Sequence, residues 1–227
     1  ANLAAVLAAI AATPDDGTGV DTLAELQAVA NAGASNANNA AAAAAALSAI
    51  SAAAQANNAT DTNVPASVFT TAGVTGVDAN NVAAIQSALN SAAVNGLATD
   101  TLPEVQAVVD AYNAIKANAD TAATTNATPA QYTAVGVTGI DNAAKANLLG
   151  DAIDGKTFAD VDTVPELQAL ADAAAAVMTG AAGGAAPTQA QLAALGITGV
   201  TPANLAAVLA AIAATPDDGT GVDTLAE

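Results

Sequence analysis

The sequence contains no cysteine, histidine, arginine or tryptophan. Disulfides, thiolate or imidazole metal ligands, and the Ser–His or Cys–His pairs of nucleophilic catalysis are therefore excluded. Paired carboxylates could still perform acid–base chemistry of the glycosidase type. However, the acidic residues fall at helix caps and loops and lack the aromatic platforms of sugar clefts, so we expect no enzymatic activity.

Aromatic residues are also scarce, with two Phe and two Tyr in 227 residues, so a large aromatic core cannot be built. Apolar residues make up 53% of the chain, and alanine supplies most of them. Alanine has the highest helix propensity but little side-chain area to bury. We expect closely packed helices with thin cores, which gain stability when neighbouring units stack.

Positive charge is the third scarcity. Three lysines stand against 21 acidic residues, which gives a formal net charge of −18. Phosphate backbones and anionic membrane surfaces repel such a polyanion, so we expect no nucleic-acid partner. The longest alanine-rich run, Ala40–Leu47, is far shorter than the roughly 20 apolar residues of a membrane-spanning helix, so we expect no membrane insertion.

Internal repetition is the strongest feature that is present. Residues Ala1–Glu25 recur letter for letter as Ala203–Glu227, a period of 202 residues. Within it, G-[VI]-T-G-[VI] occurs at Gly73, Gly136 and Gly196. A second motif, Asp-Thr followed by Glu three residues after the threonine, starts at Asp21, Asp100, Asp162 and Asp223. Such periodicity is typical of repeat architectures.

These landmarks divide the chain into related units. We predict a first, enlarged unit over 1–72 that lacks its start, a second over 73–135, a third over 136–195, and the start of the next period over 196–227. The extra length of the first unit is placed in the Asn/Ala-rich stretch Ala34–Asn58. Both ends of the sequence are interpreted as cuts in a longer array.

Each unit is predicted to hold three helices. The first is short and precedes the glycine turn, with Phe69, Tyr132 and Leu192 at equivalent apolar positions. The second carries an i, i+3, i+4, i+7 stripe, and the third is the longest. The stripes are Leu205, Val208, Leu209 and Ile212 in a second helix, and Leu102, Val105, Val108, Val109, Tyr112 and Ile115 in a third. The predicted fold is all-α, with tandem three-helix units stacked into an elongated helical repeat array.

Capping residues mark where these helices begin. The threonines of the Asp-Thr motif have the Thr-x-x-Glu spacing of a capping box. Thr128 with Gln131, and Thr188 with Gln191, have the amide version of that spacing. Thr201 before Pro202 is predicted to cap a second helix that starts at the proline. Asp78 and Asp141 are predicted as the equivalent caps in their units.

One loop offers candidate metal ligands. The carboxylates of Asp15, Asp16 and Asp21, and their copies Asp217, Asp218 and Asp223, lie among glycines and are hard oxygen ligands suited to Ca²⁺. A third loop offers Asp154, Asp160 and Asp162. The spacing lacks the EF-hand order and its closing Glu. The alternative is a glycine-containing turn beside a helix N-terminus, where the helix dipole favours negative charge.

The units also suggest a family. The segments GVTGVDANNVAAIQSALN and DTLPEVQAVVDAYNAI resemble the helical repeats of very long repetitive bacterial surface proteins, such as RTX-type and biofilm-associated adhesins. The resemblance covers essentially the whole chain. It implies an extracellular or cell-surface array that holds a binding module away from the cell, and it implies calcium dependence. It transfers no ligand-binding residue.

Three functions follow as hypotheses. The first is a structural stalk or extender of a large extracellular bacterial adhesin, whose partners are the neighbouring repeats of the same chain. The second is a self-assembling subunit of an extracellular filament, sheath or surface layer, because identical units make identical interfaces with other copies. The third is a calcium-responsive adhesive module. No other cofactor is expected.

Overall fold

A computed structural model describes residues 2–14, 16, 18–56, 64–121, 125–215 and 221–226. Within these ranges the regular structure is helical and contains no strand, which confirms the all-α prediction. The elements are α1 (Asn2–Ala11), α2 (Leu23–Ala56), α3 (Ala66–Ala72), α4 (Val82–Leu89), the 3₁₀ turn η1 (Gly96–Ala98), α5 (Leu102–Thr121), α6 (Pro129–Ala134), α7 (Ala143–Asp154), η2 (Phe158–Asp160), α8 (Val164–Ala181), α9 (Gln189–Ala194) and α10 (Leu205–Ala213).

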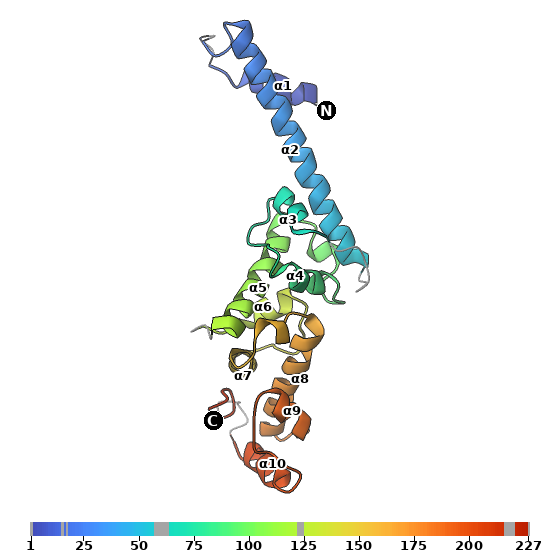
Figure 1. Ribbon diagram of the computed structural model, residues 1–227, viewed down its shortest axis with the longest axis vertical. Helices are drawn as coiled ribbons and strands as arrows, with labels where there is room; N and C mark the ends of the chain where they lie inside the picture. Colours follow the sequence, from blue (N-terminus) through green and yellow to red (C-terminus); the bar gives the residue numbers. More distant parts are fainter. Residues whose placement is uncertain are drawn as a thin grey trace.

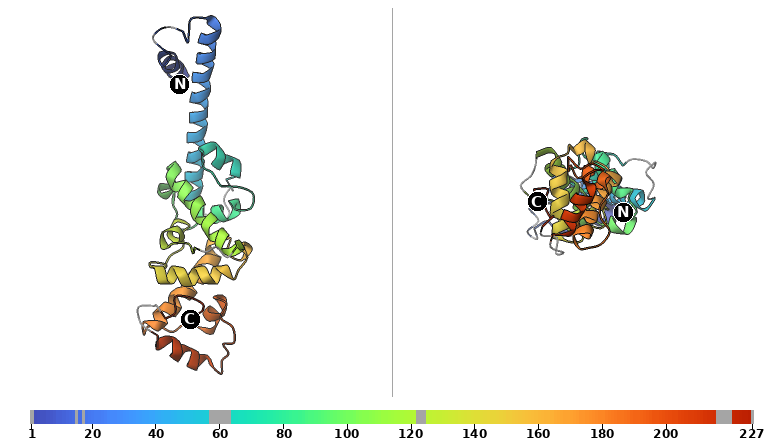
Figure 2. Two further views of the ribbon diagram at one scale, coloured as in Figure 1. Left: turned by 90° about the vertical axis from the view of Figure 1, so that its left-hand side faces the viewer. Right: turned by 90° about the horizontal axis from the view of Figure 1, so that it is seen from below.

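The molecule is elongated, with α1 and the start of α2 at one end and α10 at the other (Figure 1). Seen along its long axis it has a compact cross-section (Figure 2, right). The long helices α2, α5 and α8 follow one another along that axis (Figure 1). The chain therefore advances mainly in one direction.

Contacts between helices alternate along this axis. Each long helix packs with the short helix that follows it, as α2 does with α3, α5 with α6 and α8 with α9. The middle helix α4 contacts α2, α5 and α8, and the middle helix α7 contacts α5 and α8. At the ends, α1 packs on α2 and α10 packs on α8.

The Gly-x-Thr-Gly motif ends each short helix. Its first glycine has φ of 93°, 91° and 92° at Gly73, Gly136 and Gly196, a left-handed conformation that glycine adopts at no steric cost. The next amide then donates to the carbonyl of Phe69, Tyr132 or Leu192, respectively. All three of those side chains have zero exposure, which confirms their predicted place in the core.

The long helix α5 buries the predicted apolar face. Val105, Val109, Tyr112 and Ile115 have zero exposure. Leu102 was predicted on the same face, but it is 38% exposed. It is the first residue of α5, and at that end of the helix no further turn of α5 covers it.

The first long helix absorbs the extra length of the enlarged unit. Helix α2 has 34 residues, against 20 in α5 and 18 in α8, and it runs without a break through most of the Asn/Ala-rich stretch. Its buried residues are Gly33, Ala46, Ile50 and Ala54. The enlargement is therefore a longer helix rather than an added domain.

The predicted capping boxes of Thr22, Thr128, Thr163 and Thr188 are confirmed, and that of Thr101 is confirmed in part. Thr163 pairs with Glu166, Thr128 with Gln131 and Thr188 with Gln191, in each case with both reciprocal bonds. The same reciprocal bonds join Thr22 to Glu25. Thr101 donates from its amide and its hydroxyl to Glu104. Glu227, the partner predicted for Thr224, lies outside the described residues.

The predicted caps of the middle helices are wrong by up to a turn. Helix α10 begins at Leu205, with Asn204 as its N-cap, and not at Pro202. The side-chain oxygen of Asn204 accepts the amide of Thr201, and this bond closes a turn before the helix starts. The cap of α4 is Asn81 rather than Asp78, and that of α7 is Asn142 rather than Asp141. Asn81 and Asn204 each accept a backbone amide and donate to a glycine carbonyl within the turn. Asn142 accepts the amide of Lys145.

Phe158 lies in the segment between α7 and α8. It lies in η2, is 7% exposed, and has the Lys116 ammonium 4.7 Å from its ring centroid. This cation–π contact joins η2 to α5. No helix in the described ranges has both the length and the hydropathy that a bilayer span requires.

Candidate functional site

In the acidic loop between α1 and α2, the carboxylate of Asp16 is hydrogen-bonded within the loop itself. One oxygen of Asp16 accepts the amide of Thr18 at 3.1 Å and its hydroxyl at 2.8 Å. These bonds, the amide first, hold the pKa of Asp16 below its ordinary value. This is an Asx turn, the arrangement expected of a loop that stabilises its own backbone.

Asp21 meets Glu25 at the start of α2. A side-chain hydrogen bond with Glu25 raises the pKa of Asp21. The same bond, together with those from Thr22, lowers the pKa of Glu25. Both carboxylates are exposed or half-exposed. They repel each other unless a proton or a cation lies between them.

This carboxylate pair recurs in the other units. Burial and then the charge of Glu166 raise the pKa of Asp162. The pKa of Glu104 is lowered chiefly by Thr101, with a smaller effect from Asp100. The pair has a signal in the sequence, the i, i+4 spacing of Asp and Glu in the Asp-Thr motif.

Of the other candidate ligands, Asp223 is described and half-buried, whereas Asp15, Asp217 and Asp218 lie outside the described residues. Asp160 accepts from the amide and hydroxyl of Thr157. Among the residues that the structure describes, no group of three or more acidic side chains is placed to hold a metal ion. The calcium site stays a prediction.

A second recurrent arrangement joins separate elements. Gln106 of α5 accepts the Thr75 amide at 2.9 Å and donates to the Thr75 carbonyl at 3.1 Å. Gln168 of α8 makes the same two bonds with Thr138, at 2.9 and 3.1 Å. We call this reciprocal pair the Gln–Thr clamp. It attaches the Gly-x-Thr-Gly turn to the long helix that follows it.

Each clamp glutamine also bonds one turn along its own helix. Gln106 donates to Asp110 at 2.8 Å and Gln168 to Asp172 at 2.7 Å. Both amide hydrogens and the carbonyl oxygen of the side chain thus have partners. Since a glutamine of this kind can reach two partners at once, it fixes the turn in one orientation.

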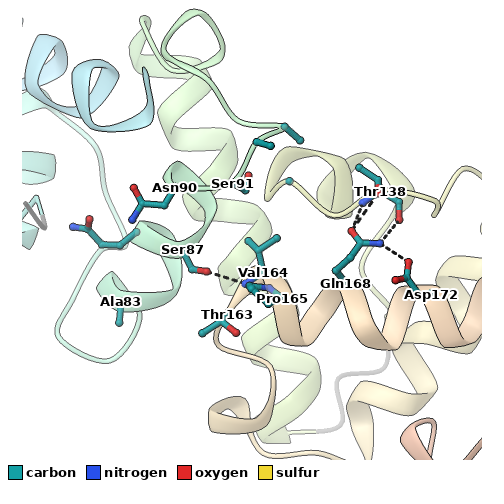
Figure 3. A pocket seen from close by; sticks show the side chains of 14 residues that line it. Ala83, Ser87, Asn90, Ser91, Thr138, Thr163, Val164, Pro165, Gln168 and Asp172 are labelled. Atoms are coloured by element: carbon teal, nitrogen blue, oxygen red, sulfur yellow. Dashed lines mark hydrogen bonds between the residues drawn. The ribbon is translucent and has the colours of Figure 1, made fainter. Parts of the chain in front are cut away.

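An open groove of about 860 Å³ lies where α4 meets the start of α8 (Figure 3). The Ser87 hydroxyl accepts the Val164 amide there at 2.8 Å, which links residues 77 positions apart in the chain. The single carboxylate in the lining, Asp172, already accepts from Gln168 (Figure 3). The groove lining has no lysine or arginine and no second acidic residue.

Taken together, the described residues form an all-helical chain with recurrent capping, clamp and turn elements. Comparison with protein-family models, with curated proteins and with solved structures finds no match to this chain.

Proposed function

We propose that the chain is a structural repeat segment, a stalk or extender of a large extracellular bacterial adhesin or surface protein. In this proposal its three-helix units stack along one axis, and the units meet near the boundaries predicted at 73, 136 and 196. Its role is mechanical: it sets the distance between the parts of the protein at its two ends. The interaction that maintains this distance is the packing of one unit on the next.

The observation that carries the proposal is the alternation of helix contacts. The middle helix α4 touches the long helices α2 and α5 and also the start of α8, and α7 touches α5 and α8. A middle helix in this position shares its apolar surface between its own unit and the previous one. Units that complete each other's cores in this way grow in one dimension.

The polar contacts support the same organisation. The Gln–Thr clamp occurs at Thr75 with Gln106 and at Thr138 with Gln168, at matched distances. The net charge of −18 favours an extended and soluble polyanion over aggregation. The resemblance to repetitive surface proteins supports the extracellular setting.

Scattering on a lengthened chain tests the proposal. One further 202-residue period would be placed ahead of the chain, and the radius of gyration would be compared with that of the original. An axial array predicts a rise of roughly 1.9-fold with an unchanged cross-section. A globule of the same length predicts only about 1.3-fold.

Sedimentation of both chains supplies the control, because association would also raise the radius. Monomeric mass with the smaller rise would contradict the stalk. So would specific, saturable binding of a sugar or a protein to the isolated chain.

A further inference from the structure

The same helix occurs twice in this molecule in two environments. The 25 residues that begin the chain are identical to the 25 that end it, so α1 and α10 have the same sequence. Helix α1 packs on the helix that follows it, α2. Helix α10 packs on the helix that precedes it, α8. Comparing the two copies therefore shows which surface of the helix is covered in one copy and exposed in the other.

The two copies bury different but overlapping faces: Val6 and Ile10, and their counterparts Val208 and Ile212, are half-buried in both copies, and the residues beside them differ. In α1, Ala5 and Ala9 are half-buried, and both lie against Gly33 of α2. Their counterparts in α10, Ala207 and Ala211, are exposed. We call this side of the helix the alanine face.

The leucine face shows the reverse. Leu205 and Leu209 of α10 are partly buried and pack against the core cluster. Their counterparts in α1, Leu3 and Leu7, are 72% and 56% exposed. Exposed leucines on a surface helix are common singly, but here an identical helix in the same chain shows what covers them.

Helix α4, which lies inside the array, has both faces covered. Ala84 and Ala88, at the positions of Ala207 and Ala211, are 1% and 0% exposed. Gln86, at the position of Leu209, is 6% exposed. A middle helix between two long helices is thus buried on both sides.

The two partners of a further Gln–Thr clamp also lie at opposite ends of the molecule. Gln27 of α2 occupies the position of Gln106 and Gln168, and it donates to Asn31 one turn along, as they do to their aspartates. In the clamps of Gln106 and Gln168 the threonine lies in the turn before the middle helix, and the middle helix that corresponds to it here is α1. Thr198, in the last such turn, is exposed at the opposite end of the molecule.

We propose that the leucine face of α1 is a docking site for the α8–α9 end of a second copy of this chain, residues 164–200, in the geometry that α10 already has on its own α8. Docking covers Leu3 and Leu7 and brings Thr198 of one copy to Gln27 of the next. The contact is head-to-tail and does not close, so it extends the array. The inference rests on the stacked-repeat organisation proposed above.

In the unsubstituted sequence α10 already occupies this surface. A tethered helix has an effective concentration on the order of millimolar, so α1 of another copy displaces it poorly at micromolar protein. The chain's own α10 therefore acts as a cap on its α8–α9 end. Removing that cap without touching α1 should uncover the docking surface.

Matched substitutions in the two identical helices test this, at a salt concentration of about 0.15 M that screens repulsion between the acidic chains. Leu205→Asp with Leu209→Asp releases α10 and leaves α1 intact. We expect the weight-average mass in sedimentation equilibrium to rise at least two-fold as the protein approaches the millimolar range. Leu3→Asp with Leu7→Asp alone should leave the wild-type mass, and all four substitutions together should restore it.

A second pair of variants avoids placing charge on the surface. Ala210 is exposed in the interior of α10, and Ala8 is its counterpart in α1. Ala210→Pro breaks α10, at a cost of about 3 kcal/mol in helix stability. It should produce the same association, and Ala8→Pro should cancel it.

The proposal is overturned if both α10 variants stay monomeric at the highest concentration, or if the combined variants associate as strongly as the α10 variants alone. Circular dichroism separates these outcomes from general unfolding, since only the helicity of α10 should be lost. Failure here would leave the axial growth of the lengthened chain untouched. A globular lengthened chain would instead remove the stacked repeats themselves.

Discussion

Threonine caps several helices of this chain, and the residue three positions later determines how each cap responds to pH. Glutamate fills that position after Thr101 and Thr163, and glutamine after Thr128 and Thr188. The two residues accept the same hydrogen bonds. Only the glutamate carries a charge that the helix N-terminus stabilises.

Glu104→Gln should therefore remove pH dependence from the start of α5. The pKa of Glu104 is held below its ordinary value of 4.5, mainly by Thr101. A carboxylate with a lowered pKa stabilises the fold above its ordinary pKa, and this stabilisation is lost as the pH falls through the folded-state pKa. Urea unfolding should show the wild type more stable than the variant at pH 7, with the difference closing below about pH 4.5.

The reverse substitution supplies the control. Gln131→Glu places a carboxylate in the equivalent box of α6 and should introduce the dependence that Glu104→Gln removes. All other carboxylates titrate equally in the compared chains and cancel. A stability difference that stays constant between pH 7 and pH 3 would show that the charge of Glu104 contributes nothing.

At the residue scale, the sequence predicted the features that depend on residues close together in the chain. The capping boxes and the burial of Phe69, Tyr132 and Leu192 follow from spacing alone. The middle-helix caps did not, since two polar residues three positions apart compete to begin the helix. The side chain of Asn81 donates to the Gly76 carbonyl and to Asn113, a residue 32 positions away, and no local pattern reveals that partner.

At the scale of elements, the junction of α1 with α2 depends on one close approach. A Cβ at Gly33 would lie 2.9 Å from the Ala5 carbonyl oxygen and 3.0 Å from the Ala9 Cβ. The nearest obstacle is backbone, which cannot rotate away. Glycine is therefore required here by proximity, although it lowers helix propensity by about 1 kcal/mol relative to alanine.

Gly33→Leu should detach α1 from α2 while leaving α2 helical. The sequence has no cysteine, so a single Ala5→Cys reports on the junction through its rate of reaction with a thiol reagent. Ala5 is half-buried, whereas Ala207, in the identical context of α10, is exposed. We expect Cys labelling at position 5 to be slower than at position 207, and to reach the same rate once Gly33→Leu is added.

Ala32→Leu is the matched control, because Ala32 is the neighbouring residue of α2 and its side chain is exposed. It adds the same leucine without entering the junction, and it should leave labelling at position 5 slow. Equal labelling rates at position 5 with and without Gly33→Leu would mean that α1 does not need the close approach.

The order of the helices could be predicted from the sequence, but the contacts between them could not. The order of short, middle and long helices followed from the glycine turns and the apolar stripes. The continuity of α2 through an alanine-rich run was less visible, since a run of one residue type has no periodicity to read. The Gln–Thr clamps join residues 31 and 30 positions apart and were missed, although both partners lie in recognised motifs.

For the candidate site, the sequence could nominate carboxylates but could not say which of them meet. The loop of Asp16 closes on Thr18, and Asp21 turns to Glu25 rather than to Asp16. The recurrent Asp–Glu pair is an exposed i, i+4 arrangement at a helix start. Such a pair binds a cation only where further oxygens complete the coordination shell.

At the scale of the whole molecule, charge of one sign is the dominant unbalanced force. Attraction is limited to three lysines; Lys145 lies 2.9 Å from Asp141, and Lys116 contacts Phe158. The remaining acidic groups repel one another along the axis. Because this repulsion acts over a Debye length of about 10 Å at 0.1 M salt, ionic strength should modulate the stability of every unit.

Thermal unfolding should therefore shift upward with salt. Between about 0.01 and 0.15 M NaCl we expect the Tm to rise by roughly 2–5 °C, which corresponds to about 1 kcal/mol for a chain of this size. Screening of net repulsion gives this sign; a fold held by surface ion pairs would give the opposite one. A fall in Tm over the same range would contradict the account.

Divalent ions then separate screening from a specific site. At equal ionic strength, Ca²⁺ and Mg²⁺ screen alike, but a loop of carboxylates with flexible geometry discriminates in favour of the larger ion. An additional rise in Tm with Ca²⁺ alone would establish the predicted calcium loop if it is abolished by Asp16→Asn, Asp21→Asn, Asp218→Asn and Asp223→Asn together, which removes both copies of the loop, and is retained by Asp110→Asn on the outer face of α5. Equal rises in Tm with both ions in the wild type and both variants would assign the effect to screening by counterions. The loop would then be a turn stabilised by its own hydrogen bonds, since one oxygen of Asp16 already accepts from Thr18.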